Sequence, residues 1–198
     1  MTAPVTFSLA LSNETATAHL MADLALLIGP GDLITLSGDL GAGKTAAARA
    51  MIRYLADDDA LEVPSPTFTL AQSYDLAPFP LVHADLYRVN DPIELEEIGL
   101  QPLPEATVVL IEWPERAAGA LPEDRIDIAL SHRPALGSAA RSAATNVFPG
   151  AICSIRWMIP VSVAMMKVSA ASVLVSWIIP SVEAIWIPSG GRSPSAIR

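Results

Sequence analysis

A glycine-rich loop carries the clearest chemical signal in this chain. It lies within LITLSGDLGAGKTAAARAM, residues 33–51, where Gly38 to Thr45 match the pattern G-x-x-x-x-G-K-[ST] without a mismatch. An apolar run precedes the loop, and a run of good helix formers follows it. Glycines let the backbone point successive N–H groups at phosphate oxygens, and the positive end of the following helix adds to the attraction. The stretch therefore predicts a phosphate-binding loop.

Lys44 and Thr45 end this loop and extend the prediction to a nucleotide and a metal. A lysine at this position is attracted to the β- and γ-phosphates by about 4 kcal/mol at ~4 Å, for an effective dielectric constant of about 20 and before desolvation. A threonine hydroxyl is a suitable ligand for Mg²⁺. The sequence contains no N-K-x-D pattern that would read guanine, which favours adenine and hence ATP.

Two carboxylates that follow predicted strands are candidates for metal binding and hydrolysis. The metal in such sites is normally held by an acid near the phosphate loop. Glu112 directly follows the apolar run TVVLI, and we expect it to bind Mg²⁺ together with Thr45. Asp85, in LVHADLY, is a second candidate, either for the metal or for positioning the attacking water. A structural carboxylate at a turn is the alternative for Asp85.

The remaining candidates carry weaker signals. The loop PSPTF exposes the hydroxyl groups of Ser65 and Thr67 on a backbone that two prolines stiffen. This suits a segment that senses a γ-phosphate through one hydroxyl, with a rigid connection as the alternative. Trp113 is more typical of a packing residue than of a base-stacking platform. The histidines are scattered along the chain and predict no metal site: His19, His83 and His132.

The elements around these residues alternate between strands and helices. Apolar or alternating runs predict strands at 5–9, 32–37, 68–76, 80–87, 106–113 and 123–130, the last at a sheet edge. Helices are expected at 13–28, at 44–55 and in DPIELEEIGL, where Asp91 would be the cap. This order predicts an α/β fold, a P-loop NTPase-like three-layer α/β/α domain whose central sheet is mainly parallel with antiparallel additions.

Composition divides the 198 residues into two parts. The formal net charge is -9, so the chain has no basic field with which to bind nucleic acid alone. Residues 144–198 contain four basic residues and one acidic residue, which leaves a net charge of -12 on residues 1–143. We predict one domain at 1–143 and a divergent low-charge tail at 144–198, frame-shifted or disordered. A second small domain is the alternative, whereas prolines and charges in the tail disfavour a membrane span.

Cysteine content and the N-terminal residues bear on the compartment. One cysteine excludes a disulfide framework, and the first residues lack the pattern of a signal peptide. We therefore expect a cytoplasmic protein that does not associate with a membrane.

Five motifs in this order, GDLGAGKT, SPTFTL, HADLYR, ELEEIGL and LIEWPER, resemble the TsaE (YjeE) family over about residues 5–142. The resemblance implies a P-loop ATPase that takes part in bacterial tRNA threonylcarbamoyladenosine synthesis, the modification of an adenosine next to the anticodon. It further implies ATP and Mg²⁺ as cofactors and TsaB and TsaD as protein partners, with tRNA contacted only indirectly. In one departure, Ser138 stands where an arginine is common in the family.

The resemblance also assigns roles to individual residues. It implies that the phosphates are held by Asp39, Leu40, Gly41, Ala42, Gly43, Lys44 and Thr45, and Mg²⁺ by Thr45 and Glu112. Lys44, Thr67 and Asp85 would support hydrolysis, with Thr67 in a switch-like loop. Trp113 would lie near the nucleotide or a partner, and Glu14 and Thr17 on the adenine side.

Two other functions remain open from the sequence. A small-molecule kinase would need arginines in a lid over the phosphates, and Arg88 is the main candidate after the loop. A non-hydrolysing module would instead use a bound nucleotide to order a surface for partners.

Overall fold

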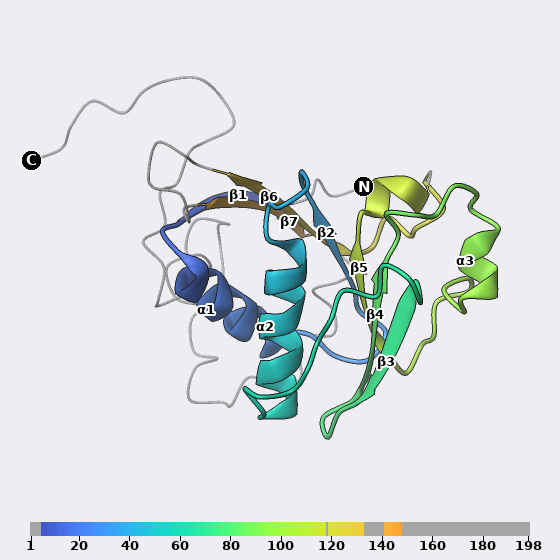
Figure 1. Cartoon of the computed structure of the whole chain (residues 1–198), viewed down its shortest axis with the longest axis horizontal. Coiled ribbons are helices and arrows are strands. Elements are labelled where there is room, and N and C mark those ends of the chain that lie inside the picture. Colours follow the sequence, from blue (N-terminus) through green and yellow to red (C-terminus); the bar gives the residue numbers. More distant parts are fainter. Residues whose placement is uncertain (1–4, 118, 133–140, 148–198) are drawn as a thin grey trace, which may run out of the picture.

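One sheet runs through the part of the chain that the structure describes, residues 5–117, 119–132 and 141–147 of a computed structural model. Its strands lie in the order β1-β7-β6-β2-β5-β4-β3 (Figure 1). Their bounds are β1 Val5–Leu11, β2 Leu33–Ser37, β3 Ala71–Asp75, β4 Pro80–Asp85, β5 Val108–Glu112, β6 Ile126–His132 and β7 Arg141–Val147.

The middle of this sheet is parallel. β6, β2, β5 and β4 pair in parallel, whereas β1, β7 and β3 are added by antiparallel pairing. β5 is buried along its whole length and β2 along nearly all of it. Strands covered on both faces are near-continuous apolar runs, which explains why the runs LITL and VVLI lie at the centre. The predicted α/β fold with antiparallel additions is confirmed.

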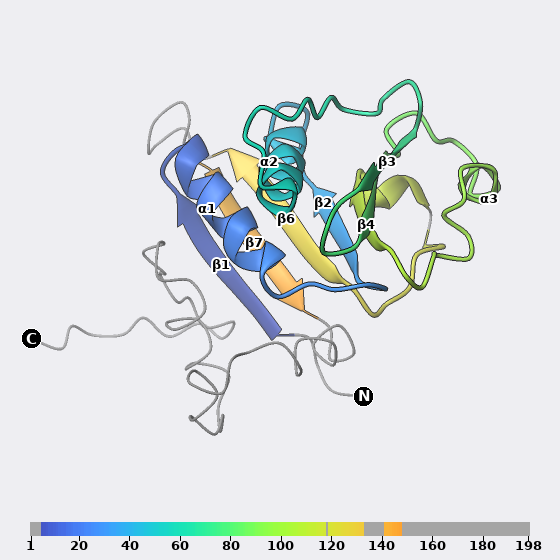
Figure 2. The same cartoon turned by 90° about the horizontal axis from the view of Figure 1, so that it is seen from below.

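Two helices cover one face of the sheet. α1 (Glu14–Ala25) and α2 (Lys44–Ala56) lie side by side over it, α1 across β1 and β7 and α2 nearer β6 and β2 (Figure 2). The side chain of Asn13 caps α1 by accepting the N–H of Ala16 at 2.8 Å. Val108 and Leu110 of β5 point into the core under these helices. Alternate residues of a strand face opposite sides, so their neighbours build the second core.

That second core lies on the opposite face and has a thinner cover. Val109 and Ile111 of β5 contribute to it. It is covered by the short helix α3 (Glu94–Glu97), the 3-10 turn η1 (Pro114–Ala117) and the connecting loops. Within the described residues the three layers are therefore unequal, with long helices on one side only.

The structure corrects the predicted position of the last strand. β6 does not lie at an edge, because it pairs with β2 on one side and with β7 on the other. Ile126, Ile128 and Leu130 are buried, whereas Ala129, between the last two, is exposed. The alternation thus reports that one face of the sheet is open at β6, which says nothing about its place in the strand order.

Asp91 makes the hydrogen bonds expected of the predicted cap, although the regular helix begins slightly later than this cap implies. α3 has Ile93 as its N-cap, and no side-chain hydrogen bond caps it. Asp91 accepts the N–H of Ile93 at 3.0 Å, while the Glu94 carboxylate accepts the N–H of Asp91 at 3.0 Å. These reciprocal bonds form a capping box, with Asp91 at the cap position and Glu94 three residues later.

The predicted division of the chain at residue 143 stays a prediction. β7 continues to Val147 and so includes the first four residues of the predicted tail at 144–198, whereas the rest of that tail lies outside the described residues. In the described part of the chain, no helix is long and apolar enough to cross a bilayer.

The first glycine of the loop provides a test of how the loop packs on the sheet. Gly38 has a φ of +131°, and a Cβ there would overlap the carbonyl oxygen of Leu130 in β6. We expect Gly38→Ala to destabilise the fold by about 1–3 kcal/mol, several degrees in melting temperature, because backbone cannot move aside as a side chain does. Gly29→Ala, with open space around the added Cβ, is the matched control. Equal melting temperatures for the two variants would contradict this packing.

Candidate nucleotide-binding site

The glycine loop joins the end of β2 to the start of α2. Ser37 ends the strand and Lys44 begins the helix. Gly43, at the N-cap of α2, has a left-handed φ of 100°, which favours glycine, and no side chain caps this helix end. A helix start without a side-chain cap leaves backbone N–H groups available to an anion.

Lys44 lies folded against its own loop. Its Nζ donates to the carbonyl oxygens of Gly38 at 2.6 Å and Asp39 at 2.9 Å. The same Nζ is 3.5 Å from the centroid of the Trp113 ring, a cation–π contact. Desolvation lowers the pKa of Lys44, and the attraction of carboxylates, that of Glu112 first among them, opposes this shift only in part. The loop therefore holds a positive charge at a cost.

Glu112 lies at the centre of a buried hydrogen-bond chain. Thr45 Oγ1 donates to its Oε2 at 2.9 Å, and His83 Nε2 lies 2.9 Å from its Oε1. Glu112 is 1% exposed and His83 is fully buried. The chain joins α2, β5 and β4, which meet at the carboxyl ends of the parallel strands.

Asp85 forms a second polar cluster beside the first. Its Oδ2 accepts hydrogen bonds from Ser65 Oγ at 2.6 Å and Thr67 Oγ1 at 2.9 Å, and its Oδ1 accepts the N–H of Tyr87 at 3.0 Å. In the β4–β5 register, Asp85 lies opposite Glu112. The PSPTF loop is thus tied to the strand that carries the second candidate carboxylate.

These groups surround one cavity of about 410 Å³. It is lined by Leu40, Gly41, Gly43, Lys44, Thr45, Ala46, Ser65, Thr67, Asp85, Tyr87, Glu112 and Trp113. Two of the predicted loop residues do not line it: Asp39 contributes its carbonyl to Lys44, and Ala42 is buried in the core.

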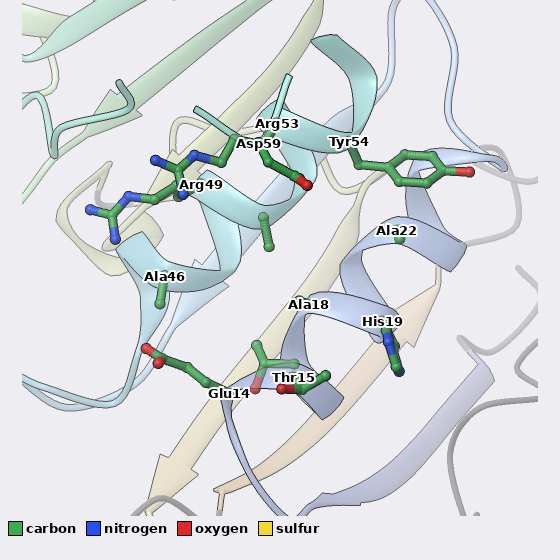
Figure 3. Close-up of a pocket in the computed structure, with 12 residues that line it drawn as sticks. Glu14, Thr15, Ala18, His19, Ala22, Ala46, Arg49, Arg53, Tyr54 and Asp59 are labelled. Carbon is green, nitrogen blue, oxygen red and sulfur yellow. The ribbon is translucent and has the colours of Figure 1, made fainter. Parts of the chain in front are cut away.

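A second cavity of about 500 Å³ runs between α1 and α2 (Figure 3). Glu14 and Thr17, predicted on the adenine side, line this groove together with Arg49 and Arg53 of α2. Figure 3 shows Glu14 below Ala46, at the end of the groove where α2 begins. Ala46 lines both cavities, so the groove adjoins the cavity of the glycine loop. The roles assigned to Glu14 and Thr17 stay predictions.

The side-chain oxygens of Thr45 and Glu112 are suitable ligands for a magnesium ion. Both offer oxygen ligands, which this cation prefers, and their oxygens already lie within 2.9 Å of each other. Among the described residues, no group of three or more histidine, cysteine or acidic side chains is placed to hold a metal. Two protein ligands completed by phosphates and water are the usual arrangement for Mg²⁺ beside a nucleotide.

The sequence patterns assign no site role to three residues of this site. They indicate Ser65 only as an exposed hydroxyl, give no signal for Tyr87, and leave His83 among the scattered histidines. Two signals were present. His83 and Asp85 are two positions apart on one strand and so point to the same face, and a histidine inside an apolar strand requires a polar partner.

A mainly parallel sheet with a G-x-x-x-x-G-K-T loop between a central strand and a helix defines a P-loop α/β protein. Residues 11–142 match the family model described as "Threonylcarbamoyl adenosine biosynthesis protein TsaE", and the chain belongs to the TsaE family. The resemblance predicted from the five motifs is confirmed.

Individual relatives agree with this assignment. Proteins named "tRNA threonylcarbamoyladenosine biosynthesis protein TsaE" match at 36% identity over 120 residues in Rickettsia bellii (61% of this chain, 83% of the relative). In Rickettsia felis the match is 40% identical over 107 residues, or 54% of this chain and 62% of the relative. In Bacillus subtilis it is 39% identical over 102 residues, or 51% and 62%. The chain thus spans less than two thirds of the last two relatives.

A solved structure supports the same fold. The crystal structure of Bacillus subtilis YdiB superposes with a TM-score of 0.61 and 27% sequence identity, covering 78% of this chain and 94% of that one. The family model and the relatives named above carry names that refer to threonylcarbamoyladenosine biosynthesis.

The buried lysine leads to a prediction about stability. We expect the melting temperature of the wild type without nucleotide to rise relative to that of Lys44→Met as pH increases from 7 towards 10.5, and the variant to bind no nucleotide. The variant keeps a side chain of similar length but removes a charge that the folded protein holds at a cost. Thermal unfolding and titration with a fluorescent ADP derivative measure the two effects.

The pH dependence gives the sign of this effect. Because the pKa of Lys44 is lower in the folded state than its ordinary value of 10.5, the unfolded state holds this proton more tightly. The wild type therefore gains stability as pH rises through the lowered pKa towards 10.5, whereas Lys44→Met lacks this gain. A wild type that loses stability relative to the variant over this pH range would contradict the assignment.

Proposed function

We propose that this chain is a Mg²⁺-dependent ATPase of the bacterial machinery that makes threonylcarbamoyladenosine in tRNA, and that it acts with TsaB and TsaD. The observation that carries the proposal is that three groups of polar side chains line one cavity. Lys44 from the loop, the Thr45–Glu112 pair and the Asp85–Thr67 pair all line it. The family match supplies the process, and the cavity supports the reaction.

The proposed division of labour follows from the charges around the cavity. Lys44 and the backbone of the loop bind the phosphates, and Lys44 exchanges its two carbonyl partners for phosphate oxygens. A magnesium ion held by Thr45 and Glu112 would neutralise charge that develops on the phosphates. Asp85 offers a carboxylate beside the same cavity, and we assign it the positioning of the attacking water.

Thr67 is the group that we propose to sense the γ-phosphate. Its hydroxyl lines the cavity and donates to Asp85, so a change in its partner is transmitted directly to the carboxylate that positions water. Ser65 donates to the same Asp85 oxygen and keeps it satisfied when Thr67 turns away. This coupling would link nucleotide state to the PSPTF loop.

We place adenine in the groove between α1 and α2. The groove adjoins the cavity of the glycine loop at Ala46, and Glu14 and Thr17 line the groove. The absence of an N-K-x-D pattern from the sequence favours adenine over guanine. This placement brings α1 into the nucleotide site, although the phosphate-binding motif lies wholly outside that helix.

Exposed apolar residues beside the cavity support a protein partner. Leu40 of the glycine loop is 79% exposed and Phe68 of the PSPTF loop is 83% exposed. Large apolar side chains in water are typical of interaction sites when they gather in one area. Because both loops border the phosphates, a partner that covers them would respond to the bound nucleotide. The same observation favours the non-hydrolysing module as the second candidate function.

The metal assignment is tested by Glu112→Gln, which keeps the shape of the side chain and removes its charge. We expect Mg²⁺-dependent hydrolysis to fall at least about 100-fold, because the metal contribution is worth several kcal/mol. Glu115→Gln is the matched control, since it removes an exposed neighbouring carboxylate that also acts on Lys44. Phosphate release at saturating ATP measures both variants. Wild-type turnover in Glu112→Gln would refute the metal role.

The partner assignment is tested by adding purified TsaB and TsaD to the full chain. We expect ATP turnover to rise when both are present, and no rise with Glu112→Gln under the same conditions. Nucleotide-dependent binding to the pair without any hydrolysis would favour the non-hydrolysing module. Transfer of phosphate to a small molecule rather than to water would favour the kinase. That last function has little support, because the guanidinium of Arg88 stacks on the Phe68 ring at 4.5 Å.

A further inference from the structure

His83 is an ionisable side chain inside the sheet, and the proposed mechanism does not use it. It lies in β4, is fully buried, and does not line the cavity of the glycine loop. Its Nε2 is 2.9 Å from Glu112 Oε1, on the side of the carboxylate away from Thr45. Any influence of His83 on a nucleotide or metal must therefore pass through Glu112.

The surroundings of the second ring nitrogen, Nδ1, indicate which of the two nitrogens of His83 carries the proton. Nδ1 of His83 is buried and has no hydrogen-bond partner within the described residues. A ring with its proton on Nε2 pairs that N–H with the Glu112 carboxylate and leaves Nδ1 as an uncharged acceptor without a partner among the described residues. His83 is therefore the donor in this contact.

A carboxylate that accepts from one fixed donor has a restricted orientation. The terminal torsion of a glutamate side chain is broad, so burial alone does not select which oxygen faces Thr45. With Oε1 held by His83, Oε2 is turned towards Thr45 Oγ1. Partners behind a metal ligand commonly fix its orientation and raise its affinity in this way.

From these contacts we propose that His83 is a positioning residue, which holds the Glu112 carboxylate so that Oε2 faces the metal that Thr45 and Glu112 would share. The proposal rests on the proposed metal role of Glu112. It predicts a selective effect, because Asp85 has its own donors in Ser65, Thr67 and the N–H of Tyr87 and does not depend on His83. Loss of His83 should weaken metal binding and spare nucleotide binding in the absence of metal.

The experiment compares two substitutions of His83, which separate the effect of losing the hydrogen-bond donor from the effect of losing the ring. His83→Phe keeps a planar ring and has no donor, whereas His83→Gln has no ring and keeps an amide donor of similar reach. Mn²⁺ is titrated into each ADP-loaded protein and followed by electron paramagnetic resonance. We expect His83→Phe to bind Mn²⁺ about 10- to 100-fold more weakly than the wild type, and His83→Gln to regain most of the loss.

Two further measurements keep a structural effect apart from a positioning effect. The affinity for a fluorescent ADP derivative in excess EDTA should be unchanged in both variants, and near-ultraviolet circular dichroism should show native packing. In the unmutated protein, ¹⁵N–¹H correlation spectra of the imidazole should show the proton of His83 on Nε2. This last measurement requires no variant to fold, and a proton on Nδ1 would overturn the proposal.

The remaining outcomes distinguish this proposal from the one on which it rests. Glu112→Gln is titrated with Mn²⁺ in parallel. If Glu112→Gln binds Mn²⁺ weakly and His83→Phe binds it as the wild type does, positioning by His83 is wrong and the metal role of Glu112 stands. If Glu112→Gln itself binds as the wild type does, the metal role fails and the inference fails with it. Equal losses in His83→Phe and His83→Gln would show that the donor is not what matters.

Discussion

A carboxylate buried at the end of β5 constrains the arrangement of the whole candidate site. Glu112 is 1% exposed, and an ionised group at such a place is tolerated only when its oxygens are paired. The first turn of α2 supplies a hydroxyl for one oxygen, and β4 supplies an imidazole for the other. The glycine loop, the central strand and its neighbour are thereby tied at one point, the edge where the parallel strands end.

The same edge holds opposite charges at close range. Lys44 lies over the ring of Trp113, and Trp113 itself has a φ of 60°, a backbone conformation that costs a non-glycine residue about 1–3 kcal/mol. Its N–H donates to the carbonyl of Leu36 at 3.1 Å, which anchors the turn to β2. A cation with a lowered pKa, a buried anion and a strained turn are concentrated where β2 and β5 end. Stability has been exchanged for preorganisation at this edge, which is the pattern expected of a site that binds a ligand.

The proposed nucleotide site consists of two cavities that share Ala46, and the two are built from different kinds of structure. The cavity of the glycine loop is built from loops at the ends of parallel strands, whereas the groove beside it is built from two packed helices. The matched family region, residues 11–142, includes both. Exposed Leu40 and Phe68 stand on loops of the first cavity, so a proposed partner would meet the protein at the phosphates.

Local sequence was sufficient for the glycine loop, for the strand and helix that flank it, and for the place of Glu112 at the end of a buried strand, because each is specified by residues close together in the chain. A glycine conformation, a helix start and the end of an apolar run are short-range properties. The pairing of His83 with Glu112 across 29 positions, the meeting of Ser65 and Thr67 with Asp85, and the inner place of β6 were decided only by the tertiary structure. Strand order and register bring these groups together, and periodicity within one strand reports which face is buried without reporting which strand lies beside it.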